Sequence, residues 1–432
     1  MSALSGWCGA VVGSVLIGAL GLIGGIAGCS GESVSETPDP EPAPAPAPAP
    51  APPPAAPTGP LPTLIMTQAQ FPGGKPGPAK AVLYRTDGKD WFPEVVEDPD
   101  SNVWHKGMPW RDGFLTIGAQ KAMLKHWTRG DDGTWISTTL WEASFGGKFD
   151  RLRDIEIGDV DGDGSEEIVI ATHDMGVVAV GDENEDKTWT FQEMDKTPDT
   201  FVHEVEIGDV DGDGKLEFYV TPSERNKASG VSQPGGVVRY DHQEDGTYKR
   251  SGVVHWDESH AKEILVSDLD GDGTPELYVA KEGHVVKEDG AKTLKDPAQI
   301  VQMVYDGGSY TEKEIASLPG EKQCRFLVAG DVDHDGEKDL VAAGMDSGLW
   351  LLKGGDKGFT PSLILKESGG FEHATHVADL DGDGTLEIYA ASEKPDYRLL
   401  RRFVWDGAAW KSEVIAPIPD KHITWNLQDA KL

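Results

Sequence analysis

From residue 61 onward, apolar and polar residues alternate in short runs that are separated by turn residues. The runs 205–207 (Val-Glu-Ile) and 167–171 (Glu-Ile-Val-Ile-Ala) are typical. Alternation with a period of two places every second side chain on the same face of a β-strand. The pattern therefore predicts an all-β fold made of many short strands.

A turn followed by an aromatic residue recurs seven times, at spacings of 44 to 62 residues, and the aromatic residue opens a predicted strand. Six of these turns carry glycine, as in the Asp-Gly pairs 87–88 and 406–407, whereas the turn before Trp189 reads Glu-Asp-Lys. Asp-Gly between two apolar runs is a hairpin signal. The aromatic residues are Trp91, Trp135, Trp189, Tyr248, Tyr310, Phe359 and Trp410.

Seven units of about fifty residues, each with about four strands, are typical of a β-propeller. The last segment, 422–429, has the pattern of an innermost strand, whereas 61–96 has outer strands and no obvious inner one. We expect these two segments to complete one blade, which would remove the exposed sheet edges. Residues 61–432 are therefore predicted to form a seven-bladed β-propeller, with an open solenoid of β repeats as the alternative.

The first sixty residues have a different pattern. Residues 11–28 are apolar, have about the length of the apolar region of a secretory signal, and end in Ile-Ala-Gly before Cys29. This ending resembles a bacterial lipobox, a family in which the peptide is cut before the cysteine that carries the lipid. Residues 1–10 contain no Lys or Arg, which departs from the pattern, and an uncleaved apolar anchor stays open as the alternative.

We therefore interpret residues 1–28 as a lipoprotein-type signal peptide and Cys29 as the lipidation site. Residues 29–60 are rich in proline and alanine, and proline fixes φ and removes backbone donors. Such a segment is predicted to be a disordered, polyproline-like linker whose roughly thirty residues reach about 90–100 Å. The rest of the chain is expected outside the cytoplasm, in the periplasm or on the cell surface.

An acidic motif, Asp-x-Asp-x-Asp-Gly, recurs five times between an alternating run and a β-rich run, and a further acid stands three residues after each glycine. The copies are 50, 59, 63 and 48 residues apart. The acidic residues are Asp159, Asp161, Asp163 and Glu167; Asp209, Asp211, Asp213 and Glu217; Asp268, Asp270, Asp272 and Glu276; Asp331, Asp333, Asp335 and Asp339; and Asp379, Asp381, Asp383 and Glu387.

The spacing of these acids suits a hard cation. Ca²⁺ takes six to eight oxygen ligands, and Asp at loop positions 1, 3 and 5 brings three carboxylates toward one centre. An EF-hand would need Glu at position 12, where all five copies have an apolar residue. A solvated acidic turn could explain one copy but not five. The sequence therefore predicts about five structural Ca²⁺ sites, with little room left for a substrate at the ion.

The net charge and the cysteines exclude several classes of function. A formal net charge of −35 argues against binding to nucleic acid or to an anionic membrane surface. Bound cations would offset part of this charge. After Cys8 and Cys29 the chain has only Cys324, so the body can form no internal disulfide and no paired-cysteine zinc site.

The Asp-rich loops resemble the FG-GAP and VCBS repeats, the family of the integrin α-subunit propeller and of many bacterial surface proteins. The resemblance covers roughly residues 61–432, although the first two blades lack the acidic triplet and are expected to be metal-free. It implies a non-catalytic role in adhesion or in binding a protein or glycan partner. Some polysaccharide lyases and sugar dehydratases carry similar propellers, so an enzyme acting on acidic polysaccharide or sugars is the alternative.

A basic residue or a histidine stands six residues before each acidic loop, at the start of the innermost strand. These residues are Arg153, His203, Lys262, Arg325 and His373. They are expected to form an arc around the mouth of the central channel, opposite the metal loops, where an anionic ligand could bind. Ordinary solvated strand ends are the other interpretation. No Gly-x-Ser-x-Gly, His-Glu-x-x-His or P-loop motif is present, so no catalytic residue is assigned.

Overall fold

A computed structural model describes residues 59–119, 121–148, 150–227, 229–355 and 358–432. The predicted signal peptide, Cys29 and nearly all of the predicted linker lie outside these residues. Within the described ranges, no helix is both long enough and apolar enough to cross a membrane.

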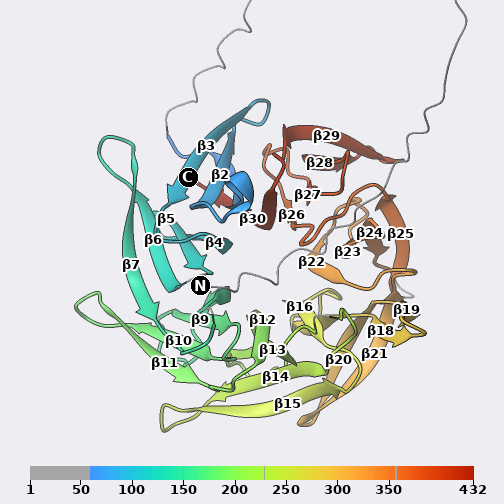
Figure 1. Cartoon of the computed structure of the whole chain (residues 1–432), viewed down its shortest axis with the longest axis horizontal. Helices are drawn as coiled ribbons and strands as arrows, with labels where there is room; N and C mark the ends of the chain where they lie inside the picture. The colour runs from blue at the N-terminus through green and yellow to red at the C-terminus, as the bar shows by residue number, and fades with distance from the viewer. Residues whose placement is uncertain (1–58, 120, 149, 228, 356–357) are drawn as a thin grey trace, which may run out of the picture. The chain divides into compact units, whose positions relative to one another are not determined.

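Seven four-stranded antiparallel sheets follow one another around a common centre (Figure 1). We call them blades 1 to 7 and give their strands from the innermost outward. Blade 1 contains β30 (His422–Lys431), β1 (Pro62–Gln70), β2 (Ala79–Thr86) and β3 (Trp91–Asp98). Blade 2 contains β4 (Trp104–Trp110), β5 (Gly113–Gly118), β6 (Ala122–Arg129) and β7 (Trp135–Ala143). Blade 3 contains β8 (Leu152–Gly158), β9 (Glu167–Thr172), β10 (Val178–Glu183) and β11 (Trp189–Met194).

The remaining four blades repeat this order. Blade 4 contains β12 (Thr200–Gly208), β13 (Glu217–Glu224), β14 (Gly235–His242) and β15 (Tyr248–Trp256). Blade 5 contains β16 (Ala261–Ser267), β17 (Glu276–Lys281), β20 (Gln299–Asp306) and β21 (Ser309–Ser317). Blade 6 contains β22 (Cys324–Gly330), β23 (Asp339–Gly344), β24 (Leu349–Lys353) and β25 (Thr360–Leu365). Blade 7 contains β26 (Thr375–Ala378), β27 (Glu387–Ser392), β28 (Leu399–Trp405) and β29 (Trp410–Pro417).

The ring closes where the two ends of the domain meet. Strand β30 pairs antiparallel with β1, with Pro62 opposite Lys431 and Gln70 opposite His422. The seven innermost strands contact one another in turn around the ring, and β30 contacts both β26 and β4. The prediction of a seven-bladed propeller closed by the chain ends is therefore confirmed, and the open solenoid is excluded.

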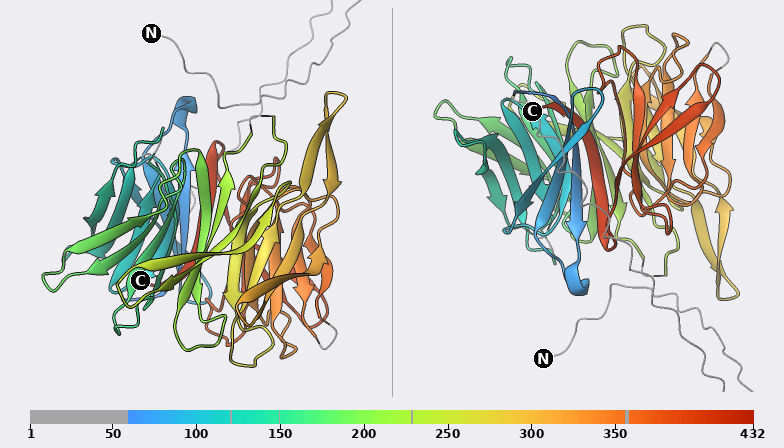
Figure 2. Two further views of the ribbon diagram at one scale, coloured as in Figure 1. Left: turned by 90° about the horizontal axis from the view of Figure 1, so that it is seen from below. Right: turned by 90° about the horizontal axis from the view of Figure 1, so that it is seen from above.

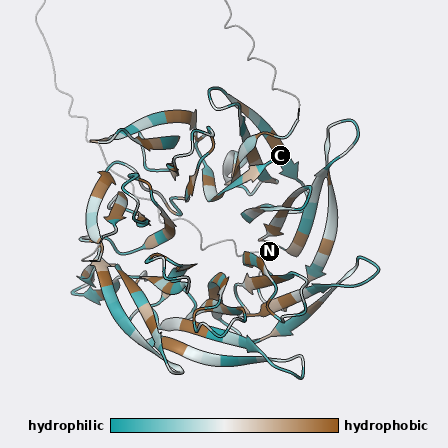
Figure 3. Cartoon of the chain, turned by 180° about the vertical axis from the view of Figure 1, so that it is seen from behind, coloured by the Kyte–Doolittle hydropathy of each residue, from teal (hydrophilic) through white to brown (hydrophobic). Residues whose placement is uncertain are grey.

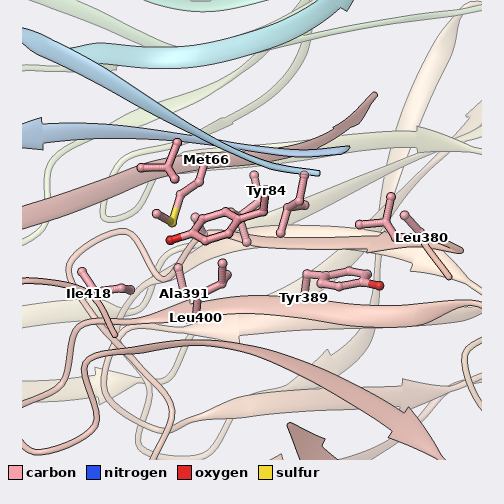
Figure 4. Packing of buried hydrophobic residues seen from close by; sticks show 12 residues of the cluster. Met66, Tyr84, Leu380, Tyr389, Ala391, Leu400 and Ile418 are labelled. Carbon is pink, nitrogen blue, oxygen red and sulfur yellow. The ribbon is translucent and has the colours of Figure 1, made fainter. Parts of the chain in front are cut away.

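The hydrophobic core lies between neighbouring blades. In one cluster, Met66 and Tyr84 of blade 1 pack against Tyr389, Ala391 and Leu400 of blade 7 (Figure 4). Full burial of an aliphatic or aromatic side chain contributes about 1.5–3 kcal/mol, so such blade-to-blade layers are the main source of stability. The outer hairpin tips are hydrophilic, and the hydrophobic positions lie within the strands (Figure 3).

The seven aromatic residues that follow turns mark the same place in every blade. Trp91, Trp135, Trp189, Tyr248 and Trp410 are the first residues of the outermost strands of their blades. Tyr310 and Phe359 lie within one residue of the start of the outermost strand in blades 5 and 6. They lie against the neighbouring blade: the rings of Trp91 and Tyr389 pack edge to face, with centroids 6.1 Å apart. This position explains why the aromatic repeat follows the blade count.

The two faces of the ring carry different connections. We call the face with the acidic loops the loop face and the opposite face, where the innermost strands begin, the mouth face. A seven-residue strand such as β8 spans about 23 Å between them. The 3₁₀ turn η1 (Pro72–Gly74) and the hairpin of β18 (His284–Glu288) and β19 (Ala291–Asp296) project from one side of the ring (Figure 2). The hairpin follows strand β17, and the end of β17 pairs with the start of the innermost strand β16. The side from which the hairpin projects is therefore the mouth face.

Candidate functional site

The five acidic loops connect the innermost strand to the second strand in blades 3 to 7. In blades 5 and 7, ligand oxygens of all four acidic residues lie within 4.8 Å of one another. In blades 3, 4 and 6, the first, second and last acids converge in the same way. The third aspartates of these three loops, Asp163, Asp213 and Asp335, lie outside the converging group. Five groups of carboxylate oxygens therefore lie on one face, but the third aspartate that the sequence predicted as a ligand joins the group in only two of them.

Each loop is shaped by its own side chains. In blade 3, the Asp159 carboxylate accepts hydrogen bonds from the backbone N–H groups of Gly162 and Gly164, at 2.8 and 3.0 Å. Gly164 has a φ of 93°, a left-handed conformation that glycine adopts without steric cost. In blade 6, His334 takes a φ of 60° at the position of Gly162. The sequence thus encodes the turn and the ligand cluster together.

The last acid of each loop is held in a partly buried, negative environment. Burial, followed by the neighbouring Asp161, raises the pKa of Glu167 to about 7. Burial also raises the pKa of Glu387 to about 7 and that of Asp339 to about 6. Convergent carboxylates whose charged form is disfavoured suit a hard divalent cation such as Ca²⁺, because the ion supplies the missing positive charge.

Among the described residues, the carboxylates of three loops also pair with a basic side chain of the protein. In blade 4, Arg239 donates to Asp211 at 2.6 Å, and in blade 7, Arg402 pairs with Glu387 at 3.1 Å. In blade 6, Lys353 pairs with Asp333. These side chains neutralise part of the carboxylate charge in blades 4, 6 and 7, so the five loops differ electrostatically.

At the mouth face, the five sequence-predicted residues are buried rather than solvated. Both nitrogens of the fully buried His373 have partners, at 2.7 Å from Ser368 Oγ and 2.8 Å from the Gly344 carbonyl oxygen. Burial lowers the pKa of His373 to about 4 and that of His203 well below its usual range. The expectation that all five residues could be cations is therefore corrected: the two histidines are neutral at pH 7, because their charged forms would lose hydration.

The other three residues, Arg153, Lys262 and Arg325, have basic side chains that lie close together. Arg153 and Arg325 both donate to the carboxylate of Glu372, at 3.3 and 2.7 Å. Burial, followed by the charge of Arg325, lowers the pKa of Lys262 to about 8. The structure thus brings Arg153, Lys262 and Arg325 into one electrostatic group, whereas His373 has a structural position beside it.

β-bulges in the innermost strands place these residues. The pairing with the second strand shifts around Arg153 in β8, Lys262 in β16, Arg325 in β22 and Trp425 in β30, and around the pairs 105–106 and 203–204. A bulge bends its strand and re-aims a side chain. Because the bulges fall at the same level in six blades, they gather side chains from distant parts of the chain at one mouth.

Several residues of the mouth were not predicted. His173 Nε2 lies 3.0 Å from His203 Nδ1, and the rings of His203 and His260 have centroids 6.4 Å apart. The ring of His105 lies edge-on to Trp425, with centroids 4.5 Å apart. Counting six residues back from an acidic loop could not identify His105 and Trp425, because their blades have no such loop. The same count passes over His173 and His260, which lie at other positions. For His105, His173 and His260, the available signal was a histidine near the beginning or end of one of the two inner strands of a blade.

Several buried atoms at this mouth have no hydrogen-bond partner among the described residues. They are His173 Nδ1, His203 Nε2, His260 Nδ1, Glu282 Oε1, Arg325 Nε and Nη1, and Trp425 Nε1. Leaving such a group unpaired costs roughly 1–3 kcal/mol, so several in one place are unusual. All of these residues lie at the mouth-face ends of strands in blades 1, 3, 4, 5 and 6, where a bound polar ligand could complete their hydrogen bonds.

A small cavity lies below the mouth. This cavity of about 20 Å³, room for roughly one water, is lined by Arg153, Arg325 and Trp425 above and by Asp154, Glu204, Glu263 and Lys106 below. Carboxylates at this lower level bond backbone N–H groups of the next blade, as Asp154 does to Val205 at 3.0 Å. These lower carboxylates therefore link neighbouring inner strands, whereas the polar atoms without a partner lie at the mouth face.

A larger hollow of about 840 Å³ lies between blades 3 and 4. Valines and glycines supply much of its lining, and two of its charged groups, Asp195 and Arg250, pair with each other at 2.7 Å. The hollow has the size of a ligand pocket, but the mouth has the larger number of unsatisfied buried polar atoms. We therefore take the mouth as the stronger candidate for ligand binding.

Its seven four-stranded sheets, closed into a ring, make this chain a seven-bladed β-propeller. Within this propeller, the FG-GAP-like repeat family matches residues 159–220, 268–342 and 331–390, which run from the first acidic loop into blade 7. The resemblance inferred from the acidic loops is thus confirmed.

Known structures share the fold at low sequence identity. A Lactobacillus plantarum protein aligns over 86% of this chain and 100% of its own length, with 12% identity and a TM-score of 0.58. A Bacteroides uniformis protein, provisionally described as a 6-phosphogluconolactonase, aligns over 86% and 100%, with 12% identity and a TM-score of 0.53. A Bacteroides fragilis protein with the same provisional description has 14% identity and a TM-score of 0.51 over 85% and 98%. No curated protein matches this chain in sequence.

Proposed function

We propose that this chain is a calcium-stabilised propeller that is anchored outside the cytoplasm by a lipid on Cys29 and binds an anionic ligand or partner at its mouth face. The observation that carries the ligand site is the convergence of unpartnered buried polar atoms with Arg153, Lys262 and Arg325. A protein side chain or a glycan could supply the anionic group.

Calcium is the ion that fits the five loops best. The ligands are carboxylates, which hard cations prefer, and no sulfur or imidazole ligand takes part in these groups. The loops join strands of the core, so an ion in each loop would stabilise the blade rather than act on a substrate. The roles of the acidic residues are therefore structural in this proposal.

Binding at the mouth is tested with the full chain and a double substitution. Arg153→Ala with Arg325→Ala should weaken retention of acidic glycans or acidic peptides on an array, most clearly at low salt. Asp381→Asn, on the loop face, is the matched control and should leave retention unchanged at saturating calcium. Equal binding of an anionic ligand by the double variant at low salt would place the binding surface elsewhere.

The lipid anchor is tested separately, because its failure would not affect the ligand site. Cys29→Ala should move the full chain from the membrane fraction to the soluble fraction or leave an uncut precursor. Unchanged mass and unchanged partition would exclude the lipobox and favour an apolar anchor.

An enzyme acting on acidic sugars is the second candidate. It is favoured by the buried neutral His203, whose Nε2 has no partner among the described residues, beside Lys262, whose pKa is lowered to about 8. Groups of this kind can exchange protons near neutral pH. Turnover of uronate-containing polysaccharides or sugar acids that is lost in His203→Gln would favour the enzyme over the binding protein.

A further inference from the structure

At the mouth, a carboxylate of the chain itself, that of Glu372, pairs with Arg153 and Arg325. Glu372 lies in the connection between β25 and β26 and is 1% exposed. Its Oε1 accepts a hydrogen bond from Arg325 at 2.7 Å, and its Oε2 lies 3.3 Å from Arg153, which belongs to a blade on the other side of the channel. One side chain thus occupies the two guanidinium groups that an anionic ligand would need.

An aromatic pair lies beside this carboxylate. Phe371 is 44% exposed, and its ring lies edge-on to that of Trp425, with centroids 6.1 Å apart. The guanidinium carbon of Arg325 lies 5.4 Å from the Phe371 ring centre, and that of Arg153 lies 5.3 Å from the Trp425 ring centre. The two cations therefore contact both the internal carboxylate and an aromatic surface that reaches solvent.

We propose that Glu372 holds the place of a ligand carboxylate and that the ligand is a small sugar acid, a ring or chain with several hydroxyl groups and one carboxylate, which displaces it. This inference rests on the proposed binding function and adds its ligand class and its internal competitor. Glu372 is a positioning residue here, since it acts by occupying Arg153 and Arg325.

Charge favours a ligand with a single negative charge. When one carboxylate replaces another between Arg153 and Arg325, the buried charge of the mouth does not change. A dianion such as phosphate would add a buried negative charge close to Glu282, and burying an uncompensated charge is costly. A long polyanion would also be repelled by the chain's net charge of −35.

Hydroxyl groups fit the remaining atoms of the mouth. His203 Nε2, His260 Nδ1, Trp425 Nε1 and two nitrogens of Arg325 have no partner among the described residues. Neutral imidazoles can donate or accept, and hydroxyls can do both as well. The apolar face of a sugar can lie on Trp425 and Phe371. A carboxylate without hydroxyls, such as acetate, would leave most of these atoms unpaired.

Displacement is needed because the cavity below the mouth is too small for a sugar. Its volume of about 20 Å³ holds roughly one water. Because Glu372 bonds both Arg153 and Arg325, a ligand carboxylate that pairs with both must take the place of Glu372. Gly369 and Gly370 precede Phe371, and Gly369 has a φ of 155°. Successive glycines permit the backbone rotation that would move Glu372 toward solvent.

The test is calorimetric titration of the full chain, at saturating calcium, with D-glucuronate, and with D-glucose and acetate as probes that lack the carboxylate and the hydroxyls. Glu372→Gln removes the competing charge and keeps the shape. It should bind D-glucuronate about tenfold more tightly than the unchanged chain if Glu372 occupies the site about nine-tenths of the time. Arg325→Ala should abolish binding.

Glu321→Gln is the matched control. Glu321 is fully buried on the same face and accepts backbone hydrogen bonds from Asp346 at 2.9 Å and Ser347 at 2.7 Å. Its substitution removes a buried carboxylate without freeing Arg153 or Arg325, so affinity for D-glucuronate should stay the same. Circular dichroism and melting curves check that each variant folds, and Glu372→Asp, which keeps the charge, should give intermediate affinity if Glu372→Gln fails to fold.

Each outcome decides the inference. Tighter D-glucuronate binding by Glu372→Gln alone, with weak responses to glucose and acetate, supports it. Equal affinity of Glu372→Gln and the unchanged chain overturns the displacement, and equal responses to acetate and D-glucuronate overturn the sugar-acid class. If no variant binds D-glucuronate while an acidic glycan or peptide still binds through Arg325, this inference fails and the proposed function stands. If no anionic ligand binds at all, both fail.

Discussion

The two ends of the same inner strands are built on opposite principles. On the loop face, blades 3 to 7 repeat one motif, and its carboxylates converge within each loop. On the mouth face, six residues earlier in the chain, the side chain varies among arginine, lysine and histidine from blade to blade, and the contacts join distant blades. Glu372 and Arg153 are 219 residues apart in sequence, whereas Asp159 and Gly164 are five apart.

This difference teaches which properties a repeat protein can vary. A metal loop must keep its own geometry, because every ligand comes from the same few residues. The mouth needs only one shared feature, the bulge, and the residue at each bulge is free to differ. The repeated face therefore stabilises the ring, and the unrepeated face is where specificity can arise.

Calcium removal should have the largest effect. At a free concentration ten times Kd, each bound ion stabilises the folded state by about 1.4 kcal/mol, so five independent ions give about 7 kcal/mol. Addition of EGTA should therefore lower the melting temperature by many degrees, measured by scanning calorimetry. Identical melting curves with calcium and with EGTA, after long incubation, would contradict a structural role for the loop face.

The substitution Arg325→Ala should have the next largest effect on stability. It leaves Glu372 buried with only Arg153 as a partner, and breaking a buried ion pair costs about 3–5 kcal/mol. The free energy of unfolding in urea should fall by this amount, while the calcium affinity stays unchanged because the loops lie at the other end of the strands. A large loss of calcium affinity would show that the two faces are coupled.

Protonation of His373 should give a smaller, pH-dependent effect. Its folded pKa of about 4 lies below the unfolded value of 6.5, because burial disfavours the charged ring. As pH falls from 6.5 toward 4 the unfolded chain takes up a proton that the folded chain does not, so stability is lost, by about 2 kcal/mol at about pH 5. His373→Asn should flatten this part of the pH profile relative to the unchanged chain, compared at saturating calcium. Parallel profiles would exclude the contribution.

Asp270→Asn, on the loop of blade 5, should give the smallest effect and one that changes sign. With calcium it should cost about 1.4 kcal/mol, the contribution of one site at ten times Kd. In EGTA it should be neutral or slightly stabilising, because one of four converging carboxylates no longer repels the others. Equal destabilisation in both conditions would mean that Asp270 acts through packing rather than through an ion.

Most of the fold could be predicted because its signals are local. Alternating runs, Asp-Gly turns and the aromatic residue that opens the outer strand repeat in every blade, and the pattern of residues 422–429 predicted the closing strand. Each acidic loop also brings its carboxylates together by its own backbone turn. These features depend on contacts between residues a few positions apart, which the order of amino acids determines directly.

The mouth was decided by the tertiary structure. The sequence located Arg153, Lys262 and Arg325 by their common offset, but it indicated neither their burial nor the neutral state of His203 and His373. It gave no signal that Glu372 would lie between Arg153 and Arg325. Burial, hydration and pairing across the channel depend on where seven blades place their inner strands once the ring is closed. In the unfolded chain a charged side chain is hydrated. Only the packed ring removes it from water and determines which side chain it pairs with.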